Sequence, residues 1–141
     1  MAQDPLWSPL ASSDAARHVV AVVVCAGLTP QGTPANLTRE FQTGQQVYLV
    51  CTVEGITAGE RHRLSVRWLL DGRLVQVAGA HSSALVMENG NVSFSITYPS
   101  SGAGVARVYW DEPVGDNNDF PNDNFLAHTR TFTIHQDAND L

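Results

Sequence analysis

Alternation of apolar and polar residues is the feature that most constrains the fold of this chain. It is clearest in residues 46–54, 63–70 and 91–98. A period of two places every second side chain on the same face of a strand, and an apolar set marks the buried face. The expected inward residues are Val47, Leu49, Cys51 and Val53, then Leu64, Val66, Trp68 and Leu70, then Val92, Phe94, Ile96 and Tyr98. No helix-length window carries the i, i+3, i+4 spacing of an amphipathic helix, so the chain is expected to be all-β.

Turn residues divide the chain into short strands. Asp71-Gly72 is a strong hairpin signal, Asn89-Gly90 predicts another tight turn, and residues 27–45 form a connection rich in Gly and Pro. The expected strands are 18–26, 46–54, 63–70, 73–77, 80–87, 91–98, 105–110 and 126–135. Seven or eight strands at this spacing predict an antiparallel sandwich of two sheets.

The length of 141 residues suits one domain. We expect residues 1–17 to be an extended N-terminal arm, a linker or a vector-derived segment, residues 18–136 to be the sandwich domain, and residues 137–141 to be a tail. The most apolar run, residues 19–26, is far shorter than the roughly 20 residues that cross a bilayer. We therefore expect no membrane insertion by this segment.

Charge and lysine content exclude several function classes. Fourteen acidic residues against eight basic ones give a formal net charge of -6, so nucleic acid is not an expected partner. All eight basic residues are arginines, which excludes a P-loop and a Schiff-base enzyme, because both need a lysine. The sequence contains no GxSxG elbow and no HExxH motif. We expect a protein that is not an enzyme and that needs no cofactor, calcium being the one alternative.

The two cysteines, Cys25 and Cys51, leave two alternatives open. A disulfide between them would close a loop of about 26 residues and stabilise the fold by roughly 3 kcal/mol. Alternatively both are buried free thiols, since free cysteine is commonly buried.

An acidic loop is the most informative stretch of the chain. Five of the fourteen acidic residues fall in residues 111–123. The candidate binding residues of this loop are Asp111, Asp116, Asn118, Asp119, Asn122 and Asp123. Clustered carboxylates and amide oxygens suit Ca²⁺, and Asp116, Asp119 and Asp123 are the candidate ligands. The alternatives are charge pairing with arginines from a neighbouring loop and a solvated turn.

Arginine is concentrated in residues 61–73. We identify Arg61, Arg63 and Arg67 as a candidate basic patch, since Arg63 and Arg67 share the outer face of one expected strand. The patch would dock an acidic partner, or else it is a solvated strand face with cross-strand ion pairs.

The order of these motifs resembles an immunoglobulin-like sandwich. A strand bearing a cysteine (VYLVCTV) precedes a strand with an inward Trp68 (SVRWLLDG), and a strand ending in Tyr98 leads through SSGAG to VARVYW. The order is similar to immunoglobulin-like modules of bacterial extracellular proteins, although residues 105–110 lack the second cysteine of antibody-type domains. The resemblance implies an extracellular or cell-surface interaction or spacer module, with a protein partner or self-association. Residues 55–63 and 111–125 would then form its binding surface at one end of the sandwich, which we call the loop end.

Two other functions stay open. The chain would be a structural subunit of an assembly, such as a virion decoration protein or a surface fibre, if its N-terminal arm docks on a neighbour. It would be a calcium-dependent carbohydrate-binding module if Trp110 or Phe120 stacks on a sugar.

Overall fold

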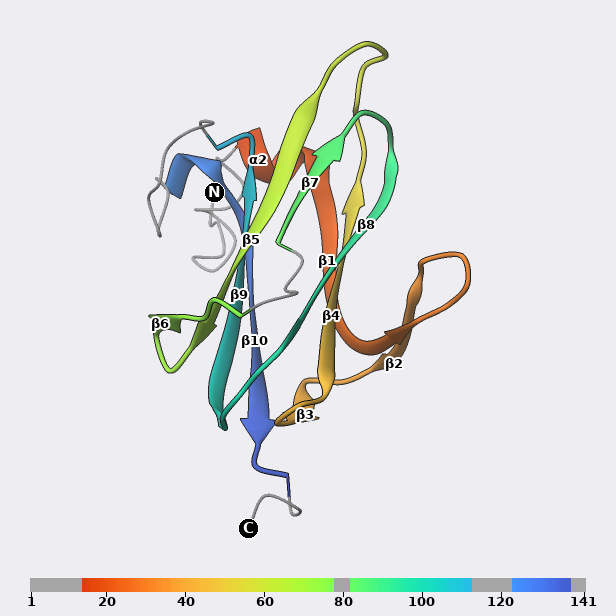
Figure 1. Ribbon diagram of the computed structural model, residues 1–141. Coiled ribbons are helices and arrows are strands. Elements are labelled where there is room, and N and C mark those ends of the chain that lie inside the picture. Colours follow the sequence, from red (N-terminus) through yellow and green to blue (C-terminus); the bar gives the residue numbers. More distant parts are fainter. Residues whose placement is uncertain (1–13, 78–81, 113–122, 138–141) are drawn as a thin grey trace, which may run out of the picture.

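Two β-sheets pack face to face in the computed structural model, which describes residues 14–77, 82–112 and 123–137 (Figure 1). The predicted all-β sandwich of two sheets is confirmed, with ten strands among the described residues where seven or eight were predicted. The elements are α2 (Asp14–His18), β1 (Val19–Leu28), β2 (Pro34–Leu37), β3 (Glu40–Gln42), β4 (Gln46–Val53), β5 (His62–Leu70), β6 (Arg73–Leu74), β7 (Ser83–Val86), β8 (Gly90–Thr97), β9 (Gly102–Trp110), the 3₁₀ turn η1 (Asp123–Phe125) and β10 (Leu126–His135).

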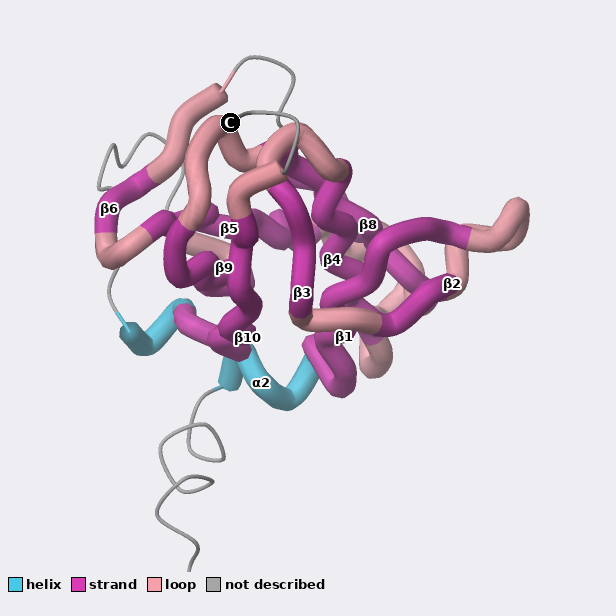
Figure 2. The backbone as a smooth tube through the Cα atoms, turned by 90° about the horizontal axis from the view of Figure 1, so that it is seen from below, coloured by secondary structure: helices cyan, strands magenta, loops and turns pink. Residues whose placement is uncertain are grey.

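One sheet has the strand order β2-β1-β4-β8, and the other has the order β3-β10-β9-β5-β6 with β7 paired to β5. The two layers separate in the end-on view of Figure 2. All these pairs are antiparallel except one, because the short β3 runs parallel to β10. The chain first crosses between the sheets at residues 38–39, between β2 and β3.

The core lies where the alternation places it. Every predicted inward residue of β4 is fully buried, and Trp68 of β5 is only 2% exposed. Leu70 and Val92, at or near strand ends, are half-buried and pack against the edge of the core. The period of two therefore predicted the buried face correctly, apart from positions near the sheet margins.

The cysteines do not form a disulfide; both are free and buried. Cys51 pairs with Val22 in the ladder between β1 and β4, and Cys25 pairs with Tyr48. Ladder partners share a face, and residues three apart on one strand lie on opposite faces. Cys25 and Cys51 therefore point to opposite sides of the same sheet, and the alternative of two buried thiols is the one that the structure shows.

Several boundaries differ from the expectation. The predicted connection 27–45 contains β2 and β3, and β9 begins at Gly102 instead of residue 105. The predicted strand 73–77 is reduced to the two residues of β6, and residues 14–18, the last four of the expected arm and the residue after it, form the helical turn α2. Strands of three or four residues are too short for alternation to reveal them; pairing with β1 and β10 defines them instead.

The two predicted turns have different roles. Asp71 and Gly72 have φ of 49° and 81°, and they join β5 to β6 as a hairpin, as expected for an Asp-Gly pair. The bend before Gly90 instead carries the chain from β7 in one sheet to β8 in the other. Among the described residues, no helix has the length and apolarity needed to cross a membrane.

Candidate interaction site at the loop end

Asp111 holds together the two loops that leave one end of the sandwich. It follows β9 directly and has a φ of 54°, a left-handed conformation that aspartate tolerates better than most residues. Its N–H donates to the carbonyl of Arg63 at 2.8 Å, and its Oδ1 accepts the N–H of Arg63 at 2.8 Å. The segment before β5 and the segment after β9 are therefore fixed to each other by backbone geometry.

His62, the first residue of β5, lies between two carboxylates of these segments. Its Nδ1 donates to Oδ2 of Asp111 at 2.6 Å, and its Nε2 donates to Oε1 of Glu60 at 3.2 Å. The hydrogen bond to Asp111 raises the pKa of His62 above its usual 6.5, with a smaller contribution from Glu60. In return, the hydrogen bond from His62 lowers the pKa of Glu60. Both ring nitrogens donate in this arrangement, as the imidazolium form requires.

The ring of His62 also stacks with two other aromatic rings. His62 lies 4.8 Å from Trp110 between ring centroids, and His18 at the end of α2 lies 5.3 Å from Trp110 and 5.8 Å from His62. The Nδ1 of His18 donates to the carbonyl of Glu54 at 3.1 Å. The stack thus joins α2, β5 and β9 at the loop end.

Glu112 is buried on the outer face of the sheet that contains β5, with 3% of its side chain exposed. Arg67 donates to it twice, at 3.0 and 2.7 Å, and the hydroxyl of Ser65 donates to the same carboxylate. Arg63 donates to the backbone carbonyl of Glu112 at 3.2 Å. A bidentate arginine and a hydroxyl satisfy this carboxylate, which is what a buried charge requires.

Tyr109, also on this outer face, is fully buried between two guanidinium groups. The guanidinium carbons of Arg67 and Arg107 lie 5.5 and 5.8 Å from its ring centroid, within cation–π range. Arg107 donates to the phenol oxygen at 2.8 Å and to Oδ1 of Asp123 at 3.2 Å. The side chain of Asp123 is 81% exposed, so this last ion pair is a surface contact.

The structure places two of the six predicted loop residues. Asp111 forms the clamp between the loops, and Asp123 pairs with Arg107. The other four, Asp116, Asn118, Asp119 and Asn122, lie outside the described residues. Two of the three candidate calcium ligands are among them, so the calcium prediction stays a prediction. Within the described ranges no three metal-ligating side chains are grouped closely enough to hold a metal ion.

The predicted basic patch is not a uniform exposed surface. Arg67 is 19% exposed and pairs with Glu112, and Arg63 reaches the backbone of that same residue. Arg61 is exposed before β5. At both described ends of the acidic loop the counter-charge comes from arginines of the sheet, Arg67 at Glu112 and Arg107 at Asp123.

Sequence reasoning did not single out several residues of this site. They are His18, Glu60, His62, Ser65, Arg107, Tyr109 and Glu112, although Glu60 and His62 fall within the predicted segment 55–63. For Ser65, Arg107 and Tyr109, the signal was available in the period of two, which places 63, 65 and 67 on one face of β5 and 107 and 109 on the matching face of β9. Asp111 and His62 are 49 positions apart, and only the fold brings them together.

No protein-family model matches this chain, and no curated protein matches it. Among the solved structures that do match is one described as the CARDB domain of the PF1109 protein in complex with di-metal ions, from Pyrococcus furiosus. It is 14% identical to this chain and has a TM-score of 0.42, and the match covers 82% of this chain and 92% of that one.

Proposed function

We propose that this chain is a non-catalytic module of an extracellular or cell-surface protein that binds a protein partner through its loop end. The binding surface would comprise residues 55–63 and the acidic segment 111–125. The sandwich serves as a rigid support that presents loops, as binding domains of this architecture commonly do.

The observation that carries this proposal is the clamp at Asp111. Its three hydrogen bonds to Arg63 and His62 fix the two segments at the point where they leave the sheet. A surface that is ordered before binding loses less conformational entropy when a partner docks. The exposed carboxylate of Glu60 beside this clamp offers a charged contact.

The state of the nucleophilic side chains supports a non-catalytic function. Burial raises the pKa of Cys51 to about 12, so its thiolate is not populated near neutral pH. The hydroxyl of Ser65 is buried against Glu112. Both nitrogens of His62 are bound to carboxylates. None of these three groups is both accessible and free to react.

Selection of a displayed random-peptide library on the immobilised chain tests the proposal. Peptides enriched on the wild type should lose affinity for Glu60→Ala at the loop end. They should keep their affinity for Glu40→Ala, a matched control, because Glu40 is also exposed and also pairs with a histidine, His135, at 2.8 Å. Binders that respond to Glu40→Ala instead, or no enriched binders at all, would count against the loop end as the binding surface.

The two other functions are distinguished by further measurements. Sedimentation that shows self-assembly abolished by removal of residues 1–13 would favour the structural subunit of an assembly, such as a virion or a fibre. Heat released on titration with Ca²⁺ and then with a glycan panel would favour the carbohydrate-binding module. Either result would replace the proposed function.

A further inference from the structure

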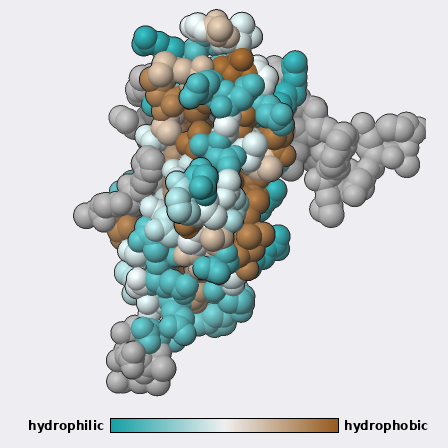
Figure 3. All heavy atoms as spheres, turned by 90° about the vertical axis from the view of Figure 1, so that its right-hand side faces the viewer, coloured by the Kyte–Doolittle hydropathy of each residue, from teal (hydrophilic) through white to brown (hydrophobic). Residues whose placement is uncertain are grey.

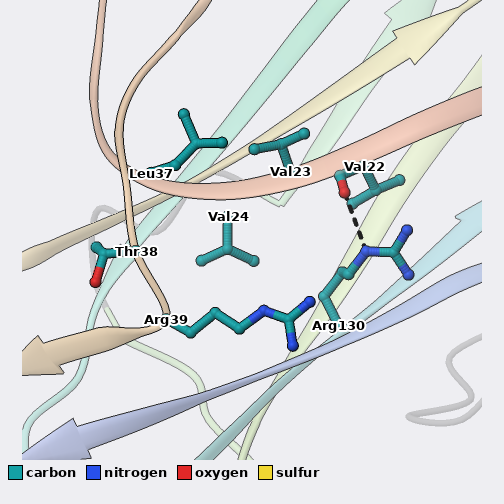
Figure 4. A pocket seen from close by; sticks show the side chains of 7 residues that line it. All are labelled: Val22, Val23, Val24, Leu37, Thr38, Arg39 and Arg130. Atoms are coloured by element: carbon teal, nitrogen blue, oxygen red, sulfur yellow. Dashed lines mark hydrogen bonds between the residues drawn. The ribbon is translucent and has the colours of Figure 1, made fainter.

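A groove with a volume of about 370 Å³ lies at the open side of the sandwich, where β1 and β10 face each other. Three consecutive valines of β1 and the residues that lead from β2 to β3 line it, together with one arginine of β10 (Figure 4). The lining residues are Val22, Val23, Val24, Leu37, Thr38, Arg39 and Arg130. Its size falls in the ordinary range of ligand sites, roughly 300–1,000 Å³.

Two guanidinium groups meet in this groove, and no described carboxylate pairs with either. Figure 4 shows Arg39 extending along the groove toward Arg130. Arg130 donates from Nε to the carbonyl of Val22 at 3.0 Å and from Nη1 to the carbonyl of Thr129 at 3.0 Å. Within the described ranges the side chain of Arg39 makes no hydrogen bond and no ion pair. Burial and the neighbouring Arg39 both lower the pKa of Arg130, in that order of importance.

The proximity of two arginines is unusual here because Arg130 is on the core-facing side of its strand. It shares that face of β10 with Phe132 and Ile134, both buried. A half-buried cation on an inner face normally has an anionic partner, since unpaired burial of charge is costly. Here the charged neighbour of Arg130 is a second arginine, Arg39, instead of a carboxylate. The groove therefore lacks negative charge, although the whole chain carries a net charge of -6.

The groove also runs along an unpaired strand edge. β2 pairs with β1 only from Cys25 to Leu28, so among the described residues no strand pairs with the outer edge of β1 from Val19 to Val24. The carbonyl of Val22 points to this edge, where Arg130 binds it. Every second residue of an antiparallel strand turns its backbone groups the same way, so the N–H and C=O of Val24 face this edge too. An extended peptide recognises such an edge through its backbone.

Exposed aliphatic side chains lie on the same elements as the groove, β1 and β2. Leu37 is 68% exposed and Val20 is 46% exposed. On the face viewed in Figure 3, hydrophobic residues are interspersed with hydrophilic ones. A ligand that fills the groove and reaches Leu37 therefore needs an aliphatic part next to its anionic group.

We propose that this groove binds an extended segment of a partner protein in which a carboxylate side chain lies between aliphatic residues. The carboxylate sits between Arg39 and Arg130, and the aliphatic residues contact Val23 and Leu37. The groove shares no residue with the loop end, so this inference and the proposed function stand or fall separately.

Calorimetric titration of the full chain with two blocked pentapeptides tests the proposal. One has the sequence valine, leucine, glutamate, valine, leucine, and the other has glutamine in place of glutamate. The glutamate peptide should bind at least about tenfold more tightly, because a charge-assisted hydrogen bond contributes that much or more. Arg39→Gln should weaken its binding by about tenfold or more, whereas Arg73→Gln, the same change at an exposed position of β6, should leave binding unchanged.

A charge reversal separates ligand binding from a structural role. Arg39→Glu places a carboxylate beside Arg130, so it should raise the melting temperature and abolish peptide binding. The proposal is wrong if the two peptides bind equally, if neither binds, or if Arg39→Gln leaves the affinity unchanged. Hexanoate binding as tightly as the glutamate peptide would also overturn it, because a free aliphatic carboxylate would then be the occupant.

Discussion

Glu112 shows how a single residue can be placed by partners that sequence spacing does not reveal. Its carboxylate is buried and accepts hydrogen bonds from Arg67 and Ser65. Removing one partner of a buried ion pair leaves the other charge without compensation. We expect Glu112→Ala to lower the free energy of unfolding by about 3 kcal/mol, the low end for such pairs because Arg67 keeps some solvent contact. Urea denaturation of the two proteins measures this difference.

The matched control replaces both charges at once. The double variant Arg67→Met with Glu112→Leu has no stranded charge, and apolar replacements of buried ion pairs are often close to neutral. It should therefore be more stable than Glu112→Ala alone. If the double variant is the less stable of the two, the ion pair itself stabilises the fold, and the loss in Glu112→Ala does not come from a stranded Arg67.

The two thiols should be inert in the folded protein. Cys51 is fully buried with its pKa raised to about 12, and Cys25 is fully buried with its Sγ directed at the carbonyl of Gly27 at 3.2 Å. Ellman's reagent at pH 8 should react with neither cysteine in the native protein and with both after unfolding in guanidinium without reductant. Fewer than two reactive thiols in the unfolded protein would reveal a disulfide.

At the scale of elements, the ring of Phe132 in β10 lies over the backbone of Gly104 in β9, because Gly104 has no side chain. A Cβ at this position would overlap the ring of Phe132, its ladder partner on β10. That ring also contacts Phe41 and Tyr98 edge-on, at centroid distances of 5.8 and 5.7 Å, and has little room to move. We expect Gly104→Ala to destabilise the protein by about 1–3 kcal/mol through overpacking, measured as a lower urea midpoint.

Gly27→Ala provides the control for that substitution. Gly27 is also in a strand, β1, but a Cβ there would meet only ordinary contacts, the nearest at 3.7 Å from Nδ2 of Asn36. The change should be neutral or slightly stabilising, since alanine loses less backbone entropy on folding. Phe132→Leu should cost less stability in the Gly104→Ala background than in the wild type, because there it also removes the overlap. An equal cost in both backgrounds would mean that the ring is not the obstacle.

The elements that sequence predicted well are those in which one face must be buried. β4, β5 and β8 have their inward residues at every second position, because the core lies on one side only. β10 was predicted with its observed limits, Leu126 to His135. By contrast, β2 and β3 exist because β1 and β10 offer them a pairing edge, and nothing within residues 34–42 specifies that partner.

The candidate sites were predictable only in part, for the same reason. The loop end was expected from the topology of the sandwich, and Asp111 was expected within it. The role of Asp111 depends on Arg63, 48 positions away, and the position of Arg130 depends on a carbonyl 108 positions away. Such contacts follow from strand register, which alternation does not determine when the partner strand is unknown.

For the whole molecule, two histidines make stability depend on pH in opposite directions. The pKa of His62 is raised above 6.5, chiefly by its hydrogen bond to Asp111. The contribution of His62 to the free energy of unfolding is complete below pH 6.5, its unfolded-state pKa. This contribution is lost as the pH rises through the pKa of His62 in the folded state. Burial lowers the pKa of His128, although its Nε2 donates to the carbonyl of Val19 at 2.7 Å. The folded protein therefore resists protonation of His128 below pH 6.5, where the unfolded chain takes up the proton.

These two contributions predict that stability is greatest near pH 6.5. The free energy of unfolding should fall above this pH as His62 loses its proton, and fall below it as the unfolded state protonates at the position of His128. Urea denaturation at intervals from pH 5 to 8.5 would show both limbs. His62→Gln should flatten the alkaline limb alone, and His128→Gln, which keeps a donor for the Val19 carbonyl, should flatten the acid limb alone. A wild-type profile that changes in one direction through pH 6.5, or variants that flatten the opposite limbs, would contradict the assigned contacts.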